Sequence, residues 1–337
     1  LTNMLSYIFT QLQEGQFNPL FLKISLKIIR YSFHIVQFED HQLIFLIQFM
    51  IDNFSQDYIN QYIKIFSKIS TIKPLLIYEI ENSLISNLIE FLNDPKVAIH
   101  FFHMIGNFSK DEKLWEMFNN NFIELFIPFF SFDESEIENP VQFINDHFFD
   151  SFSSNSDPNS AAFRCLEIIS QKNESSIIYI LENLKSEFEN PTNKIYSISH
   201  LTSAVLKNLF LANLNELAIE LFNSVFPFLQ SDSVLIKCGV LIILQFECYL
   251  DSPIEEHIHK CLEMIFDPNE LIQYFSMNVL LKNLPHFENF SILDDFPPES
   301  VVSKILQVSQ EFEIPQMTDL LHYLFKNQSY LSQVIPH

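Results

Sequence analysis

The chain has 337 residues and a formal net charge of −23, with 19 lysines and arginines against 42 aspartates and glutamates. An acidic surface repels nucleic acid and anionic membranes, so the charge excludes both and favours basic protein partners. With glycine only at positions 15, 106 and 239, the chain contains neither a glycine-rich phosphate loop nor a nucleophile elbow, and it disfavours a large sheet with tight hairpins.

Helical periodicity runs through nearly the whole chain, interrupted by short polar breaks. Apolar residues lie on one helix face in 176–188 and again in 301–312, and 234–246 is apolar nearly all round, as in a covered inner helix. The breaks fall at 13–18, 53–56, 131–139, 151–159, 189–193, 251–253 and 287–299. The pattern predicts an all-α fold, an α-solenoid of antiparallel HEAT or armadillo-type helix pairs. We expect one continuous array over 1–337.

An aspartate precedes an apolar helical stretch four times, at Asp94, Asp157, Asp232 and Asp267, and proline follows it directly in all but Asp232. Aspartate accepts hydrogen bonds from the first turn of a helix, and proline suits the first helical position. We therefore expect these four residues to be helix N-caps. Their spacing predicts a helical repeat of ~40 residues that carries insertions.

Two segments break the repeat pattern. Residues 131–139 form an acidic inter-helix loop, and 287–299 form an irregular insertion between repeats. The acidic loop suggests an electrostatic contact for a basic protein segment, although a solvated loop explains the same charges. Its four carboxylates are Asp133, Glu134, Glu136 and Glu138.

From Phe129 onward the chain resembles the importin-β superfamily of nuclear transport receptors, the karyopherins. The acidic loop runs into Asn139-Pro140-Val141-Gln142-Phe143-Ile144. This order is similar to that in the exportin that recycles importin-α and in the importins for ribosomal proteins and histones. Gln142 and Asn145 stand where those proteins usually carry glutamate and arginine, so an ionic role does not carry over to them.

The resemblance continues to Leu284 through three further stretches. His200-Leu201 with Leu206 is similar to one family helix, 225–229 to the end of a first helix of a pair, and 231–246 to the second helix that follows. The resemblance implies a central portion of a receptor that binds protein cargo, the GTPase Ran and Phe-Gly nucleoporins in the cytoplasm, nucleus and nuclear pore. Nothing near Leu1 resembles a Ran-binding N-terminal region, so we expect a fragment.

Two groups of histidines are candidates for a metal site. His257, His259 and Cys261 do not converge on a regular helix, so we interpret the histidines as surface residues beside a core cysteine. His100 and His103 share a helix face, but their surroundings are apolar, so we interpret them as core or partly buried. We expect no metal and no cofactor.

Cys165, Cys238, Cys248 and Cys261 all lie in apolar helical runs and are interpreted as core thiols, since none occurs in an activating motif. No apolar run reaches the ~20 residues of a membrane-spanning helix. The sequence therefore predicts a non-enzymatic binding protein. Two alternatives stay open: a HEAT or armadillo scaffold or regulatory subunit with no transport role, and an enzyme with a divergent helical fold.

Overall fold

Helices make up all the regular structure that the computed structural model describes: sixteen α-helices and three short 3-10 helices. The all-α prediction is therefore confirmed. The description covers residues 1–15, 17–73, 76, 88–108, 122–131, 137–144, 157–172, 174–190, 192, 194–286, 293, 295–312 and 317–326. The chain divides into two compact units, one of Leu1–Leu125 with Ser154–Lys172 and the other of Phe126–Ser153 with Asn173–His337.

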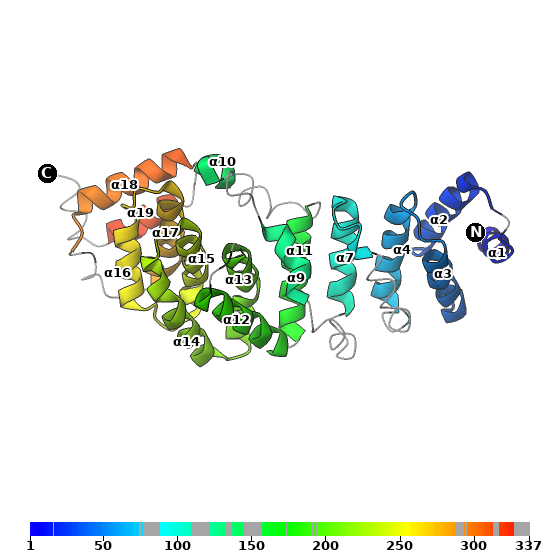
Figure 1. The fold of residues 1–337 in the computed structure, drawn as a ribbon, viewed down its shortest axis with the longest axis horizontal. Coiled ribbons are helices and arrows are strands. Elements are labelled where there is room, and N and C mark those ends of the chain that lie inside the picture. Colours follow the sequence, from blue (N-terminus) through cyan, green and yellow to red (C-terminus); the bar gives the residue numbers. More distant parts are fainter. Residues whose placement is uncertain are drawn as a thin grey trace. The chain divides into compact units, whose positions relative to one another are not determined.

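The first unit is built on one row of helices, in which α2 packs on α4, α4 on α7 and α7 on α11 (Figure 1). α1 contacts α2 and α3 contacts α4, each as the first member of a helix pair. The bounds are α1 Thr2–Gln13, α2 Pro19–Ser32, α3 Asp40–Asp52, α4 Ile59–Ile72, α7 Pro95–Phe108 and α11 Pro158–Lys172. The row exists because each helix buries an apolar face, as α4 does with Tyr62, Phe66 and Ile69.

The second unit repeats the same arrangement more regularly. Its paired helices are α12 Glu174–Glu189 with α13 Ile195–Leu211, α14 Asn215–Val225 with α15 Val234–Leu244, α16 Glu255–Met264 with α17 Glu270–Asn283, and α18 Pro298–Glu311 with α19 Met317–Lys326. The first helices of these four pairs begin about 40 residues apart. In the first unit α2, α4 and α7 begin at similar intervals, whereas α11 begins 63 residues after α7 (158 − 95). Helix starts therefore confirm the predicted repeat on either side of this longer interval.

Short 3-10 helices extend three helices of the second unit. They are η3 Phe226–Gln230 after α14, η4 Gln245–Tyr249 after α15 and η5 Leu284–His286 after α17. Before the first pair come α9 Phe122–Phe130, which crosses the division between the units, and the short α10 Pro140–Ile144.

In the inner row of the second unit, α13 packs on α15, α15 on α17 and α17 on α19, and α13, α15 and α17 bury most of their residues. α15 buries every residue from Cys238 to Leu244, as its all-round apolar sequence predicts. Gly239 lies where α15 approaches α13: a Cβ atom there would be 2.7 Å from the Ser199 hydroxyl oxygen. The absence of a side chain therefore allows these two helices to pack closely.

Two of the four predicted aspartate caps are confirmed. Asp94 Oδ1 accepts the Lys96 N–H at 2.9 Å, and its Oδ2 accepts a hydrogen bond from Asn60 at 3.0 Å. Asp157 Oδ2 accepts the Ser160 N–H at 2.8 Å. Proline occupies the first helical position after both, at the start of α7 and α11.

The other two predicted caps are wrong. Ser233 caps α15 by accepting the Ile236 N–H, and Asn269 caps α17 by accepting the N–H groups of its first turn. Both are good capping residues that lie closer to the helix start than Asp232 and Asp267 do. Asp267 instead accepts the Asn269 N–H at 2.8 Å and pairs with Lys237 of α15 at 3.7 Å, which ties α15 to the turn before α17.

Three predictions about organisation concern ranges that the structure describes only in part. In the acidic loop 131–139, residues 132–136 lie outside the described residues, and in the insertion 287–299 only 293 and 295–299 are described. α18 already begins at Pro298, inside that second range. The single continuous array over 1–337 stays a prediction. Among the described helices, none combines the length and apolarity that crossing a bilayer requires.

Candidate functional site

Of the four predicted acidic site residues, Glu138 is described and is exposed to solvent. It precedes α10, where Asn139 Oδ1 accepts the Gln142 N–H at 3.2 Å and Phe143 and Ile144 are buried. This anchoring holds Glu138 at the surface. Asp133, Glu134 and Glu136 lie outside the described residues, so a cargo contact at this loop stays a prediction.

His257 is not the surface histidine that we expect from the sequence. Its side chain is 2% exposed and its Nδ1 pairs with Oε1 of Glu247, which is 0% exposed. The other Glu247 oxygen accepts the Ile254 N–H at 3.3 Å, and the Phe226 ring stacks on the imidazole with centroids 4.0 Å apart. Burial raises the pKa of the Glu247 carboxyl. The pair holds η4 and α16 together, and the two buried side chains satisfy each other's hydrogen-bonding groups.

His259 does lie near the surface, and carboxylates surround it. Its Nε2 is 3.3 Å from Asp295 Oδ2, and its Nδ1 is 3.7 Å from Glu263 Oε1. In the part of the chain that the structure describes, no three histidine, cysteine or acidic side chains come together in a way that would hold a metal ion. These three residues therefore form a polar group at the surface, with the His259 ring between two carboxylates.

The cysteines have no environment that would activate a thiol. Cys165, Cys238 and Cys261 are buried, as expected for core thiols, whereas Cys248 lies half-buried in η4. Burial raises the pKa of all four thiols. A thiol with a raised pKa is poorly ionised at neutral pH, and the thiolate is the nucleophile. The environment of the cysteines therefore gives them no catalytic character.

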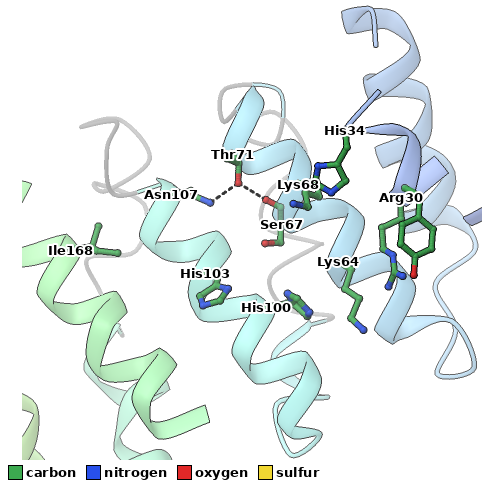
Figure 2. Close-up of a pocket in the computed structure, with 11 residues that line it drawn as sticks. Arg30, His34, Lys64, Ser67, Lys68, Thr71, His100, His103, Asn107 and Ile168 are labelled. Carbon is green, nitrogen blue, oxygen red and sulfur yellow. Dashed lines mark hydrogen bonds between the residues drawn. The ribbon is translucent and has the colours of Figure 1, made fainter. Parts of the chain in front are cut away.

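A cavity of about 520 Å³ opens within the row of helices of the first unit. Its wall comes from the C-terminal end of α2 with His34 just beyond it, from α4 and α7, and from Ile168 of α11 (Figure 2). We call it the basic pocket, because its charged lining residues are Arg30, Lys64 and Lys68, and three histidines lie beside them: His34, His100 and His103.

Regular helix spacing places these side chains on the pocket wall. Lys64, Lys68 and Thr71 fall on one face of α4, opposite the face that packs in the core, and His100, His103 and Asn107 fall on one face of α7. Asn107 Nδ2 donates to Thr71 Oγ1 at 3.1 Å, which joins the two helices at one end of the pocket (Figure 2).

The two histidines of α7 differ in burial. His100 is half-buried, as expected, but His103 is exposed, which corrects its interpretation as a core or partly buried residue. Burial, then Lys64, His103, Arg30 and Lys68 lower the pKa of His100 to about 4. Although part of the His103 ring meets solvent, the protein atoms packed around the rest of it desolvate it, and this desolvation and the charge of Arg164 lower the pKa of His103. Both imidazoles are therefore neutral at pH 7.

The cations of the pocket are held without acidic partners. Within the described residues, Arg30, Lys64 and Lys68 make no ion pair with a carboxylate, while the Arg30 guanidinium lies 4.4 Å from the centroid of the Tyr31 ring. Burial lowers the pKa of Lys64, and Arg30 and Lys96 lower it further, against an opposing effect of Asp94. The pocket is thus a concentration of positive charge.

Sequence reasoning did not find this pocket. Its members come from helices far apart in the sequence, and only the stacking of α2, α4 and α7 brings them together. The one available signal was the recurrence of Lys64, Lys68 and Thr71 along one face of an otherwise apolar helix.

Comparison with known proteins identifies the fold. No family model and no curated protein matches the sequence. The crystal structure of Kap121p bound to Ste12p matches with a TM-score of 0.63 at 11% identity, over 100% of this chain and 39% of that chain. An engineered protein matches with a TM-score of only 0.30 at 10% identity, over 93% of this chain and 94% of its own.

The match shows the fold alone: this chain is a helical-repeat array like the part of Kap121p that it covers. This chain spans well under half the length of Kap121p. The resemblance to particular importins and to an exportin stays a prediction.

Proposed function

We propose that this chain is the cargo-binding portion of a nuclear transport receptor. The observation that carries the proposal is the match of the whole chain to part of Kap121p, a karyopherin solved with the protein Ste12p bound. The motif resemblance between Phe129 and Leu284 supports the same function independently of the fold. Stacked repeats suit this role, because each contacts only its neighbours and the array presents an extended surface.

The cargo that we propose is a basic protein segment. The net charge of −23 favours such a partner electrostatically, and charge complementarity increases the rate of encounter. The proposed contact is the loop 131–139 with Asp133, Glu134, Glu136 and Glu138. The exposure of Glu138 supports this choice, since an exposed carboxylate is free to meet a lysine or arginine.

Ran bound to GTP and the Phe-Gly repeats of nucleoporins are further proposed partners, with the cytoplasm, nucleus and nuclear pore as the places of action. These follow from the motif resemblance. A scaffold with the same fold and no transport role would bind neither. Pull-down of Ran loaded with a GTP analogue and of Phe-Gly repeat fragments by the full-length gene product therefore distinguishes the two functions.

The cargo site is tested by fluorescence anisotropy with a labelled lysine-rich peptide. Neutralising Asp133, Glu134, Glu136 and Glu138 to their amides should weaken peptide binding by about tenfold or more, since each lost charge contact is worth up to ~1 kcal/mol at an exposed site. A control variant removes the same charge from exposed glutamates elsewhere: Glu182, Glu189, Glu216 and Glu256. Equal weakening in both variants would show that net charge alone attracts the peptide and that the loop is not the site.

A further inference from the structure

The basic pocket has a charge opposite to that of the protein as a whole. Acidic residues outnumber basic ones by 42 to 19, yet three of the basic residues line one cavity, and none of the described residues that line it is an aspartate or glutamate. Three histidines add imidazole N–H groups to the same wall. A gathering of cations on the wall of one cavity suits an anionic ligand.

The unliganded pocket carries an electrostatic cost. Arg30, Lys64 and Lys68 are each half-buried, and no carboxylate pairs with any of them in the described part of the chain. Asp94 is the acidic group that acts on Lys64, and its own oxygens already accept hydrogen bonds from Asn60 and Lys96. Partly desolvated like charges repel one another, and a bound anion relieves that repulsion.

We propose that the basic pocket binds a phosphate group carried by a phosphorylated serine or threonine of a partner protein. A phosphorylated side chain brings −1.5 to −2 charges and three strong acceptor oxygens, whereas a carboxylate brings a single charge. Arg30 provides a planar fork of donors, and Lys64 and Lys68 provide ammonium donors from the next helix. His100 and His103 face the same hollow from the opposite wall (Figure 2).

The size of the pocket favours a peptide over a free ion. A volume of about 520 Å³ exceeds what one phosphate group fills and lies in the range of sites for larger ligands. Apolar and aromatic surface at the pocket, from Ile168 and Tyr31, offers contact to the neighbouring residues of a peptide. The proposal stands apart from the transport function, because its residues belong to the first unit and do not include the acidic loop.

The first test uses inorganic phosphate alone and histidine NMR of the wild-type protein. The His100 resonance, identified by its loss in His100→Gln, should titrate near its low pKa of about 4 in chloride. Saturating phosphate at the same ionic strength should raise that pKa by about one unit or more, because a bound anion stabilises the imidazolium. An unchanged pKa would overturn the proposal.

Paired variants locate the site. Lys64→Gln with Lys68→Gln should weaken phosphate binding by about tenfold or more, given the strength of hydrogen bonds to charged groups. Lys23→Gln with Lys27→Gln removes the same charge from exposed positions on α2 outside the pocket and should leave binding unchanged. Equal losses in the two variants would mean diffuse attraction to surface cations and would also overturn the proposal. Circular dichroism confirms that both variants are folded.

The second test identifies the source of the phosphate. A fluorescent pool of degenerate phosphoserine peptides should bind at least about tenfold more tightly than inorganic phosphate and than the same pool without phosphate. The phosphorylated pool should bind the Lys64 and Lys68 variant much more weakly, and it should bind the Lys23 and Lys27 variant as tightly as the wild-type protein. If the peptide pool binds no more tightly than inorganic phosphate does, the ligand is a free phosphate ion, and the proposal of a phosphorylated partner protein is overturned. Neither test depends on cargo, so failure here leaves the proposed function intact.

Discussion

Close packing of α13 against α15 depends on Gly239, and a double-mutant cycle with Ser199 measures that dependence. A Cβ atom at position 239 would lie 2.7 Å from Ser199 Oγ, closer than two such atoms approach in folded proteins. The Ser199 hydroxyl is also held, because it donates to the Ile195 carbonyl at 2.8 Å. Gly239→Ala gains ~1 kcal/mol of helix propensity but incurs overpacking of ~1–3 kcal/mol, so it should be neutral to destabilising by ~2 kcal/mol.

Removing the hydroxyl should reverse that effect. In the Ser199→Ala background the nearest atom is the Cβ of residue 199 at 3.4 Å, an ordinary contact distance. Gly239→Ala should then stabilise by ~1 kcal/mol, which gives a coupling energy of ~1–3 kcal/mol between the two sites. Gly106→Ala is the matched control, because its Cβ would meet nothing closer than 3.6 Å, and it should stabilise on its own.

Urea unfolding of the four proteins of the cycle, followed by circular dichroism, provides the free energies. The reasoning is refuted if Gly239→Ala stabilises as much as Gly106→Ala does, or if its effect is the same with and without the Ser199 hydroxyl. Either result would mean that the two helices separate at no cost, and that the inner row is less closely packed than the structure shows.

Three further predictions concern polar groups. The pKa of His100 is lowered from 6.5 to about 4, so the unfolded chain binds more protons than the folded chain between these pH values. Stability should therefore fall by ~1–2 kcal/mol as pH drops from 6.5 to 4, less than the ~3 kcal/mol of the full shift, because solvent screens the partly exposed ring. His100→Gln should flatten that part of a urea-midpoint profile in phosphate-free buffer, and an unchanged slope would contradict the assignment. Glu247→Ala should destabilise the protein by ~3 kcal/mol or more, because it leaves the buried His257 without its partner. The double variant Glu247→Met with His257→Phe should recover much of that loss in thermal unfolding. No recovery would mean that the pair itself is needed for stability. Ser233→Ala should lower the free energy of unfolding by ~1 kcal/mol, and Asp232→Ala should lower it by only a few tenths, because Ser233 caps α15. A larger loss in Asp232→Ala would mean that Asp232 is the cap.

Features that depend on neighbouring residues along the chain could be predicted from the sequence. The buried face of α12 follows from the spacing of Ile177, Leu181, Leu184 and Phe188, and all four are buried. Asp94 and Asp157 are caps because proline fixes the next residue as the first helical one. Where other capping residues stand nearby, as at Ser233 and Asn269, composition does not decide which one the helix uses.

Features that depend on stacking could not be predicted. His257 lies on a helix whose sequence gives no sign of burial, and it is buried because Glu247 and Phe226, from two other elements, enclose it. The basic pocket arises in the same way. Arg30, Lys64 and His100 are more than 30 residues apart in the sequence. Arg30 and Lys64 look like ordinary surface residues of their own helices, and the apolar neighbours of His100 indicate only a partly buried residue.

We propose that this chain binds a basic protein segment through charge complementarity, as the cargo-binding part of a transport receptor. The most direct measurement is the dissociation constant of a lysine-rich peptide at about 50 mM and about 300 mM salt, since screening acts over ~6–14 Å in this range. We predict that the lysine-rich peptide binds with micromolar affinity at low salt and about tenfold or more weakly at high salt. A glutamate-rich peptide of the same length should bind at no site other than the basic pocket. Absence of binding at low salt, or an affinity that does not change with salt, would contradict the claim.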